Sequence, residues 1–411
     1  MTTSSSATLA IPSLHVPPLP ISQLHIPDYI RSIAPYIGGK PIEEVAREFG
    51  LDPAAIVKLA SNENPLGIPD SAQRAMVAAM AEIGRYPDDN GFDLKQALSK
   101  KLGVDPEWIV LGAGSSDILI TAALTFSGSA GRVVHSQYGF IVYGLAAQKI
   151  GAKITVVPAT EGLGHDLDAM LAAARGNGSE GAAQLVYIAN PSNPTGTFLQ
   201  PQRVEAFLAA VPTETVVVLD EAYTEYLEPA LRFDSTLWVR RFPNLVISRT
   251  FSKAYGLAGL RIGYGIAQPA LANLMNRVRA AFNVNALAQA AAVAALGDQA
   301  FLDESYQLNR AGLLQLTKAF DAARIEYIPP YGNFILFKAG RDDDADNDAG
   351  ARVNLALLKR GIIVRPVANY GLPQWLRVSI GTRSENQSFL AALHDAMGPA
   401  AGTIAPPRAT A

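Results

Sequence analysis

Residues Ser248–Gly263 read SRTFSKAYGLAGLRIG and directly follow the apolar run Leu245–Ile247, which predicts a buried strand. Lys253 has small and apolar neighbours in this turn, and loss of water around a lysine lowers its pKa and frees the amine to form a Schiff base with an aldehyde. Arg261 offers a planar fork that suits a phosphate, and two hydroxyl groups of the same turn suit it as well, those of Thr250 and Ser252. Taken alone, the segment could equally hold a surface lysine and a routine ion-pair partner.

Two further motifs each follow an apolar run. Asp220–Tyr223 reads DEAY and comes after Val216–Leu219. Asn190–Gly196 reads NPSNPTG and comes after Leu185–Ala189. A carboxylate at the end of an apolar parallel strand is costly unless it has a cationic partner, and a protonated pyridine nitrogen would be such a partner. The motifs therefore favour a site at the ends of neighbouring strands.

Strand-like and helix-like segments alternate from about Trp108 to Ala267, which predicts a mostly parallel sheet covered on both faces. Such sheets bind ligands at the carboxyl ends of their strands, so Asn193, Asp220 and Lys253 would meet along one edge. Residues 269–296 have helical spacing and predict one long helical region.

At 411 residues the chain exceeds one ordinary domain, which favours a large domain with a smaller companion. We expect a flexible arm, a small domain formed by an N-terminal and a C-terminal part, a large domain between them, and a flexible tail. The predicted boundaries are 1–27 for the arm, 28–60 and 301–397 for the small domain, 61–300 for the large domain and 398–411 for the tail.

In order and spacing, the motifs NPSNPTG, DEAY and SK with an arginine eight residues later resemble those of the fold-type I pyridoxal-phosphate aminotransferases. The resemblance implies an α/β fold, with a large domain on a mostly parallel sheet and a smaller α/β domain, and pyridoxal 5′-phosphate as cofactor. It implies that Lys253 carries the cofactor and moves a proton in catalysis, and that Asp220 stabilises the protonated ring nitrogen. Tyr223 and Asn193 would then hydrogen-bond the phenolic oxygen of the cofactor.

The glycine-rich turn after Trp108–Leu111 places backbone N–H groups at a predicted helix start, where they favour a phosphate. Gly112 and Gly114 are also half of a dinucleotide-binding fingerprint, but Asp117 stands where the third glycine would be, so that interpretation stays a minor rival. The resemblance implies that the cofactor phosphate contacts Ser115, Ser116, Thr250, Ser252 and Arg261.

Two aromatic residues acquire a role through the resemblance. Tyr138, in SQYGF, matches the aromatic residue that stacks on the pyridine ring, although a tyrosine after a strand more often just packs. Tyr86, in RYPDDNG, matches the tyrosine that reaches across a dimer interface to the cofactor phosphate of the partner subunit. The resemblance therefore implies a homodimer.

Within this family, the stretch from about Asp28 to Met397 looks like the histidinol-phosphate aminotransferases, at 37–41, 62–65, 85–87, 361–366 and 376–382. In that subfamily the arginines that match Arg365 and Arg377 contact the substrate phosphate. A tyrosine aligned here with Tyr36 closes over the substrate. Asn64 lies in a turn of the same pattern and is assigned to substrate binding, although turn chemistry alone would explain an asparagine there.

These matches predict reversible transfer of an amino group between histidinol phosphate and 2-oxoglutarate, giving imidazole-acetol phosphate and glutamate in histidine synthesis. Three alternatives stay open. An aromatic amino acid aminotransferase, acting on phenylalanine or tyrosine, would use the same arginines for a carboxylate. A threonine-phosphate decarboxylase of the same fold would release carbon dioxide without an acceptor, and a non-catalytic regulator would keep only the scaffold.

Composition limits the other functions. A formal net charge of −3 gives no reason to expect a nucleic acid or an anionic membrane as a partner. No cysteine and only five histidines leave little support for a metal site, and a chain without cysteine is compatible with a reducing compartment. We expect a soluble cytoplasmic enzyme, because no charged start of a secretory signal precedes Arg31 and the apolar stretch Ala280–Gly297 is typical of a buried helix.

Overall fold

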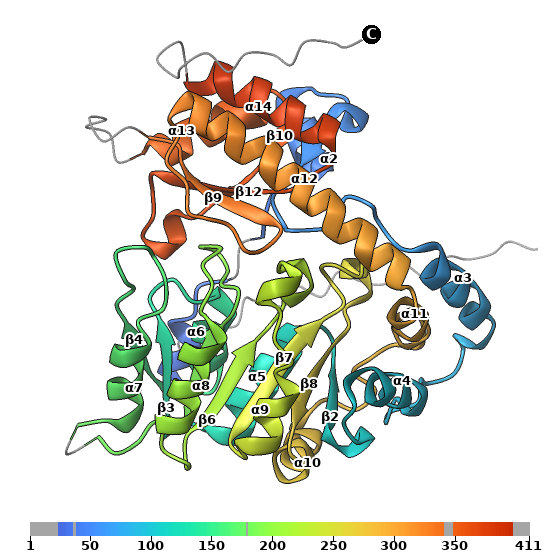
Figure 1. The fold of residues 1–411 in the computed structure, drawn as a ribbon, viewed down its shortest axis with the longest axis vertical. Coiled ribbons are helices and arrows are strands. Elements are labelled where there is room, and N and C mark those ends of the chain that lie inside the picture. Colours follow the sequence, from blue (N-terminus) through green and yellow to red (C-terminus); the bar gives the residue numbers. More distant parts are fainter. Residues whose placement is uncertain (1–23, 36–37, 178–179, 341–347, 398–411) are drawn as a thin grey trace, which may run out of the picture.

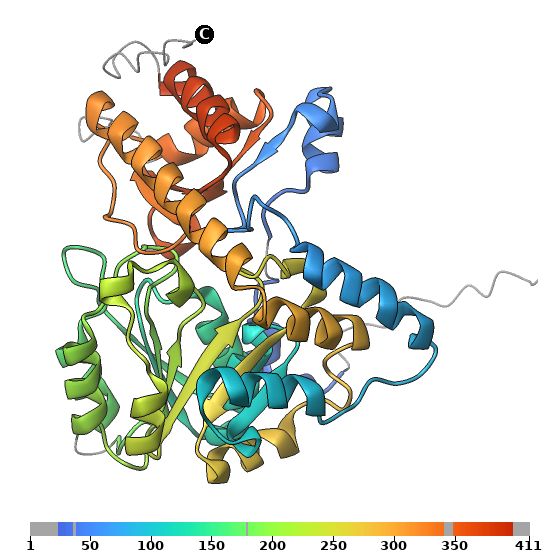
Figure 2. The ribbon, with the colours of Figure 1, turned by 45° about the vertical axis from the view of Figure 1, so that its right-hand side comes forward.

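The computed structural model describes residues 24–35, 38–177, 180–340 and 348–397. The predicted arm lies largely outside these residues, and Tyr36 and the predicted tail lie entirely outside them. Figures 1 and 2 show a large α/β body with a smaller body packed on one end of it. Among the residues described, no helix is long and apolar enough to cross a membrane.

The large body is built on a sheet with the strand order β2-β8-β7-β6-β5-β3-β4 (Figure 1). β8 pairs antiparallel with β2 and β7, because the chain doubles back from β7 through the Lys253 turn without a helical crossover, whereas the other neighbours pair in parallel. This sheet confirms the predicted α/β class. Its strands are β2 (Ile109–Gly112), β3 (Arg132–Ser136), β4 (Lys153–Val157), β5 (Leu185–Ala189), β6 (Val216–Asp220), β7 (Leu245–Thr250) and β8 (Gly263–Ala267).

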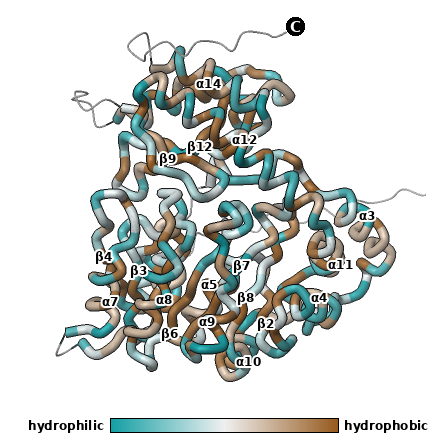
Figure 3. Tube along the Cα trace, in the orientation of Figure 1, coloured by the Kyte–Doolittle hydropathy of each residue, from teal (hydrophilic) through white to brown (hydrophobic). Residues whose placement is uncertain are grey.

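Alternate residues of the central strands enter two apolar cores, because successive side chains of a strand point to opposite faces. In β6, Val217 and Leu219 belong to one core, and Val216 and Val218 belong to the other. Figure 3 shows apolar strands running through the middle of this body. One core includes residues of α3 (Asp70–Ala79), α4 (Phe92–Leu102), α7 (Leu167–Arg175), α8 (Pro201–Ala210), α9 (Thr236–Arg241) and α11 (Ala286–Leu296), and the other includes residues of α5 (Ser115–Phe126), α6 (Ile141–Lys149) and α10 (Pro269–Val278).

The smaller body joins two distant parts of the chain. β1 (Val57–Lys58) pairs in parallel with β10 (Ile362–Ile363), and a second, antiparallel sheet has the order β11-β12-β9. The remaining elements are β9 (Phe334–Lys338), β11 (Arg365–Pro366), β12 (Trp375–Ser379), α2 (Ile42–Phe49), α13 (Ala349–Leu358) and α14 (Arg383–Met397). The predicted domain boundaries themselves stay predictions.

One long helix connects the two bodies, and a short N-terminal helix packs on the large one. The helix α12 (Gln299–Ala323) runs from the large body into the smaller one (Figure 2). Leu302, near its start, belongs to the core of the large body, and Phe320, near its end, belongs to the core of the smaller one. The short helix α1 (Asp28–Arg31) packs against α6 of the large body. The N-terminal segment therefore contacts the large body before it enters the smaller one.

One prediction about the helices is wrong. Residues 269–296 form two helices, α10 and α11, because the backbone leaves the helical path between them. Phe282 has a φ of +53°, and Asn285 caps α11 by accepting a hydrogen bond from Ala288 N at 2.8 Å. Arg279 instead forms an ion pair of 2.8 Å with Asp89. This distant contact overrides the local helical pattern.

Candidate active site

A pocket lies at the carboxyl edge of the large sheet and includes residues of the smaller body. Asp220 ends β6 and Thr250 ends β7, and Asp220 is in register with Ser248 on the neighbouring strand. The strand ends therefore meet at one edge, as a parallel topology requires. The pocket lining brings together many of the residues assigned from the sequence: Ser115, Ser116, Asn193, Asp220, Tyr223, Thr250, Ser252, Lys253, Arg261, Arg365 and Arg377.

Lys253 occupies the first turn after β7. Its Nζ donates a hydrogen bond to Ser61 O at 2.9 Å and lies 5.8 Å from the centre of the Tyr223 ring. Loss of water in the pocket, together with the positive charges of Arg377 and Arg261, lowers the pKa of Lys253 to about 7. A large fraction of this amine is therefore neutral at neutral pH and can act as a nucleophile or as a base.

Asp220 presents a carboxyl group that is only partly satisfied. Its Oδ2 accepts a hydrogen bond from Tyr143 Oη at 2.9 Å, while its buried Oδ1 has no hydrogen-bond partner among the described residues. Burial raises the pKa of Asp220 to about 6, and the hydrogen bond from Tyr143 and the nearby N–H of Ala222 only partly oppose this rise. A buried, half-satisfied carboxylate suits a cationic ligand group that carries an N–H, such as a protonated pyridine nitrogen.

An anion cradle lies where α5 begins. Gly114, with a φ of +88°, precedes the first helical residue, Ser115. A Cβ on Gly114 would lie 2.3 Å from Arg261 Nη2, and a Cβ on Gly263 would lie 2.5 Å from Ser115 N, so both glycines allow close approach. Arg261 also donates to Ser252 Oγ at 3.3 Å. The helix N-terminus, guanidinium and hydroxyl groups together suit a phosphate.

The glycine turn itself is closed by Asp117. Asp117 Oδ2 accepts hydrogen bonds from Ala113 N at 2.9 Å and from Asn283 Nδ2 at 2.8 Å. The carboxylate therefore supports the turn from inside the protein. This arrangement gives no support to the dinucleotide fingerprint that the two glycines alone suggested.

Tyr223 and Asn193 line another side of the pocket. Tyr223 Oη accepts a hydrogen bond from Asn62 Nδ2 at 2.9 Å, and burial raises the pKa of Tyr223 to about 12, so the phenol stays protonated. Asn193 Oδ1 accepts from Arg377 Nη1. Asn62 has a φ of +54° and also lines the pocket, whereas the sequence analysis selected Asn64 from the same turn.

Two arginines from the smaller body complete the lining. Arg365 of β11 lies directly opposite Arg377 of β12 in the antiparallel register. Arg377 Nη2 also donates to Ala60 O at 2.7 Å, and its guanidinium lies 5.2 Å from the centre of the Phe334 ring. Two like charges directly opposite each other are unfavourable, and an anion held between them would offset this repulsion.

Three assigned residues do not line this pocket. Tyr138 packs beside the apolar cluster that includes Leu336 and Val367. Asn64 is buried and donates to Ala254 O at 3.0 Å and to Ser305 Oγ at 2.8 Å. Tyr86 is 83% exposed. Their assigned roles stay predictions, as does that of Tyr36, which lies outside the described residues. The sequence analysis did not select four further lining residues, Asn62, Phe140, Tyr143 and Tyr370.

Comparisons with known proteins agree with this geometry. The model of the family "Aminotransferase class I and II" matches residues 54–393. A histidinol-phosphate aminotransferase of Cupriavidus pinatubonensis is 61% identical over 371 residues, which cover 90% of this chain and 96% of that protein. One of Ralstonia nicotianae is 60% identical over 374 residues, covering 91% and 97%. The crystal structure of histidinol-phosphate aminotransferase from Sinorhizobium meliloti in complex with pyridoxal 5′-phosphate superposes with a TM-score of 0.82 at 30% identity, covering 91% and 97%. The chain belongs to the class I and II aminotransferase family.

Proposed function

We propose that this enzyme transfers an amino group between histidinol phosphate and 2-oxoglutarate, with pyridoxal 5′-phosphate as cofactor, and so forms imidazole-acetol phosphate and glutamate in histidine synthesis. One observation carries the proposal. A single pocket holds an amine of lowered pKa at Lys253, a buried carboxylate oxygen without a partner at Asp220, and a phosphate cradle at the start of α5. The relatives of high identity bear the same activity in their names.

The residues present fit the cofactor. When bound, pyridoxal phosphate supplies an aldehyde that condenses with amines and a ring that withdraws electrons from the substrate carbon. Asp220 Oδ1 would accept from its ring nitrogen, and Tyr223 and Asn193 would hydrogen-bond its phenolic oxygen. The phosphate would be held by Ser115, Ser116, Thr250, Ser252 and Arg261. Stacking of Tyr138 on the ring stays part of this proposal.

Lys253 has two tasks in the proposed mechanism. Its neutral amine would hold the aldehyde group of the cofactor, and an incoming substrate amine would take its place. Once released, Nζ would move a proton between the substrate carbon and the C4′ carbon of the cofactor. A pKa of about 7 suits both directions of this proton transfer, because the amine and ammonium forms are similarly populated at neutral pH.

The opposed arginines would determine the substrate class. Arg365 and Arg377 would bind the phosphate of histidinol phosphate, and a carboxylate of the oxo-acid acceptor could take the same place. This is also why an aromatic amino acid stays the second candidate donor. Asn64 and Tyr36 stay proposed substrate contacts.

The active enzyme would be a homodimer. Large apolar side chains are exposed over residues 77–92, among them Val77 at 65% and Tyr86 at 83%. Phe282, itself 43% exposed, stacks on Tyr86 with 4.7 Å between the ring centres. An exposed apolar patch of this kind typically marks a protein contact. A second copy of the chain would cover the patch and receive Tyr86 at its cofactor phosphate.

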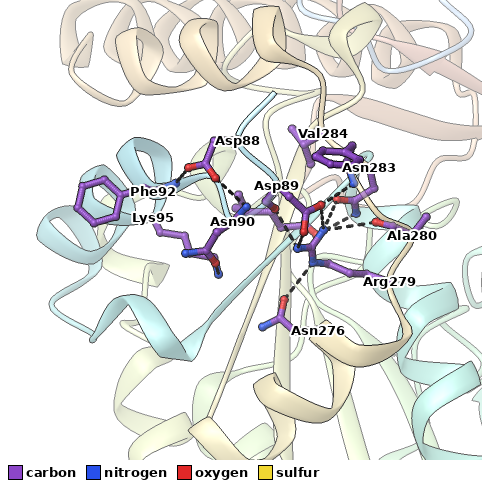
Figure 4. A network of polar contacts seen from close by, with 12 residues as sticks. Asp88, Asp89, Asn90, Phe92, Lys95, Asn276, Arg279, Ala280, Asn283 and Val284 are labelled. Carbon is purple, nitrogen blue, oxygen red and sulfur yellow. Dashed lines mark hydrogen bonds and ion pairs between the residues drawn. The ribbon is translucent and has the colours of Figure 1, made fainter. Parts of the chain in front are cut away.

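The loop that carries Tyr86 is firmly anchored (Figure 4). Asp89 pairs with Arg279, with Asp89 Oδ2 and Oδ1 at 2.8 and 3.0 Å from the guanidinium nitrogens, and Arg279 also donates to Asp89 O at 2.9 Å. Asp88 Oδ2 accepts from Phe92 N at 2.7 Å at the start of α4. These contacts hold the loop next to Phe282 and so support its use as a preformed dimer surface.

A cytoplasmic location stays part of the proposal, since a chain without cysteine is compatible with a reducing compartment. Among the described residues, no cluster of three or more His, Asp or Glu side chains could hold a metal ion. The proposed chemistry needs none.

A donor panel tests the proposal. The purified enzyme, loaded with pyridoxal phosphate, is given histidinol phosphate, phenylalanine, tyrosine or threonine phosphate, and glutamate formation from 2-oxoglutarate is measured. We expect the highest kcat/KM for histidinol phosphate. A strong preference for an aromatic amino acid would overturn the choice of donor. Release of carbon dioxide from threonine phosphate without an acceptor would instead indicate a decarboxylase.

A further inference from the structure

We propose that Tyr143 is a positioning residue whose phenol fixes Oδ2 of Asp220 and keeps this carboxyl charged, so that Oδ1 faces the ring nitrogen of the cofactor as an acceptor. The inference rests on the proposed function, because it requires pyridoxal phosphate in the pocket. Tyr143 lies on α6, and no motif of the sequence selects it.

The contact between the two side chains is direct and enclosed. Tyr143 Oη lies 2.9 Å from Asp220 Oδ2, and both residues are buried. Both also line the pocket. Asp220 Oδ1 has no hydrogen-bond partner in the described part of the chain. The carboxyl group therefore has one oxygen bound by the protein and one that a ligand can use.

The packing around Tyr143 fixes the direction of its phenol. The Tyr143 ring stacks on Tyr187 with 4.7 Å between the centres and only 4° between the planes. Phe140 meets the same ring edge-on at 5.9 Å. Tyr187 is itself held because its Oη donates to Leu119 O at 2.7 Å. Because the Tyr143 ring packs between Tyr187 and Phe140, its phenol has little freedom to turn away from Asp220.

The charges around Asp220 explain why this hydrogen bond matters. Burial and the nearby Glu221 favour the neutral carboxyl, whereas the phenol of Tyr143, the Ala222 N–H and the charge of Lys253 favour the carboxylate. Among the influences that oppose burial, the Tyr143 phenol is the strongest. The other ionisable groups that face Asp220 are Tyr187 and Tyr223, and both are buried phenols whose pKa is raised.

Tyr143 itself stays a donor over the whole working range. Burial, and next the charge of Asp220, raise the pKa of Tyr143 well above its usual value. Its proton therefore stays on the phenol and points toward Oδ2. When a pyridine nitrogen and a carboxyl share one proton, the more basic group holds it. A phenol that stabilises the carboxylate thus leaves the proton, and its positive charge, on the ring.

The test compares Tyr143→Phe with Tyr187→Phe. Each change deletes one buried hydroxyl from the same stacked pair, but the Tyr187 hydroxyl bonds a backbone carbonyl instead of Asp220. Cofactor-free protein is titrated with pyridoxal phosphate, and its visible absorption is followed from pH 5 to 9. In Tyr143→Phe we expect the cofactor Kd to rise about tenfold, as for the loss of a hydrogen bond to a charged group.

The pH profile gives a second readout. Affinity falls in acid as Asp220 takes up a proton, and loss of the phenol makes the carboxyl more basic, so the fall should begin at a pH about one unit higher in Tyr143→Phe. Lys253 titrates in every variant, so the difference between the variants isolates Asp220. Tyr187→Phe should keep the pH profile of the parent protein.

A cofactor analogue separates positioning from general packing. With a C–H group in place of the ring nitrogen, the analogue cannot use Asp220 Oδ1, so Tyr143→Phe should bind it as well as the parent protein does. An equal loss of affinity for the cofactor and the analogue would overturn the inference, because it would show a purely structural role. Equal affinities and pH profiles in all three proteins would overturn it too. If none of the three binds pyridoxal phosphate, the proposed function fails instead.

Discussion

The floor of the pocket, formed by Asp220 and Lys253, and the surface around Tyr86 both have groups without a contact, but of opposite polarity. At the floor, Asp220 and Lys253 are titratable groups whose pKa values lie near 6 and 7, and one carboxylate oxygen lacks a partner. Around Tyr86, large apolar side chains are exposed to water, whereas Asp89 of the same loop is paired with Arg279. We expect the floor to bind the charged cofactor and the surface to bind a second copy of the chain.

The two regions are also held in place by different kinds of contact. At the floor, the aromatic rings around Tyr143 hold Asp220 in place, and the proposed cofactor would neutralise the charge of this buried carboxylate. At the surface, the Asp89–Arg279 pair holds the loop, and the proposed second subunit would cover the apolar area that is exposed there. Variants of the two regions should therefore differ in kind as well as in size.

The largest effect is expected from Lys253→Ala. Loss of both the aldehyde-binding amine and the proton-transferring group should lower kcat by about four orders of magnitude. The absorption band of the bound cofactor should change as well. Steady-state transamination and the visible spectrum measure these effects, with thermal unfolding to confirm that the chain is folded. Retained turnover together with a retained absorption band would contradict the role of Lys253.

Asp220→Asn should lower activity but stabilise the cofactor-free chain. Loss of the charge facing the ring should reduce kcat by about 10²- to 10³-fold. The folded pKa of Asp220, about 6, lies above that of an unfolded aspartate, so this group lowers the stability of the cofactor-free protein as pH rises from about 4 to 6.

In Asp220→Asn this pH-dependent loss is absent. The cofactor-free variant should therefore be more stable than the parent protein at pH 7, by an amount of order 2 kcal/mol, and should melt a few degrees higher. Thermal unfolding of the cofactor-free proteins at pH 4 and pH 7 measures this. A variant less stable than the parent at pH 7 would show that the buried charge is already well compensated without a ligand.

Arg365→Ala tests whether the two arginines that the smaller body adds to the pocket bind the substrate. If the opposed arginines bind the substrate phosphate, loss of one should raise KM for histidinol phosphate by about 10- to 100-fold with a smaller change in kcat. Arg360→Ala is the control, since Arg360 belongs to the same body, pairs with Asp395 at 3.7 Å and does not line the pocket. An unchanged KM in Arg365→Ala would remove this arginine from the substrate site.

The sequence predicts the sheet edge well because each motif there follows its own strand. Asn193, Asp220 and Lys253 each come after an apolar run, and parallel strands bring such positions together whatever the rest of the chain does. The motif residues at the start of α5 are also predictable, because they are neighbours in sequence within one turn. Backbone geometry alone places these groups.

Residues positioned by tertiary packing could not be found in this way. Tyr143 lies in the mostly apolar helix sequence IVYGLAAQK, where nothing distinguishes it from a core residue. Asn62 and Asn64 occupy one turn, but Asn62, which has a positive φ, donates to Tyr223, whereas Asn64 donates to Ala254 O. The break between α10 and α11 depends on Asp89, which lies far away in the sequence.

The smallest effect is expected from Asp89→Asn, which acts on the surface and leaves the floor intact. The Asp89 side chain is 42% exposed, so the ion pair with Arg279 should contribute no more than about 1 kcal/mol. A looser Tyr86 loop should raise the dissociation constant of the dimer by about three- to fivefold, measured by sedimentation. Asp88→Asn is the control, because the described side-chain contacts of Asp88 stay within its own loop and the start of α4. The pH dependence of cofactor binding should be unchanged in both variants. If Asp89→Asn shifted that dependence as Tyr143→Phe is expected to do, the surface would be coupled to the floor and the two regions would not be independent.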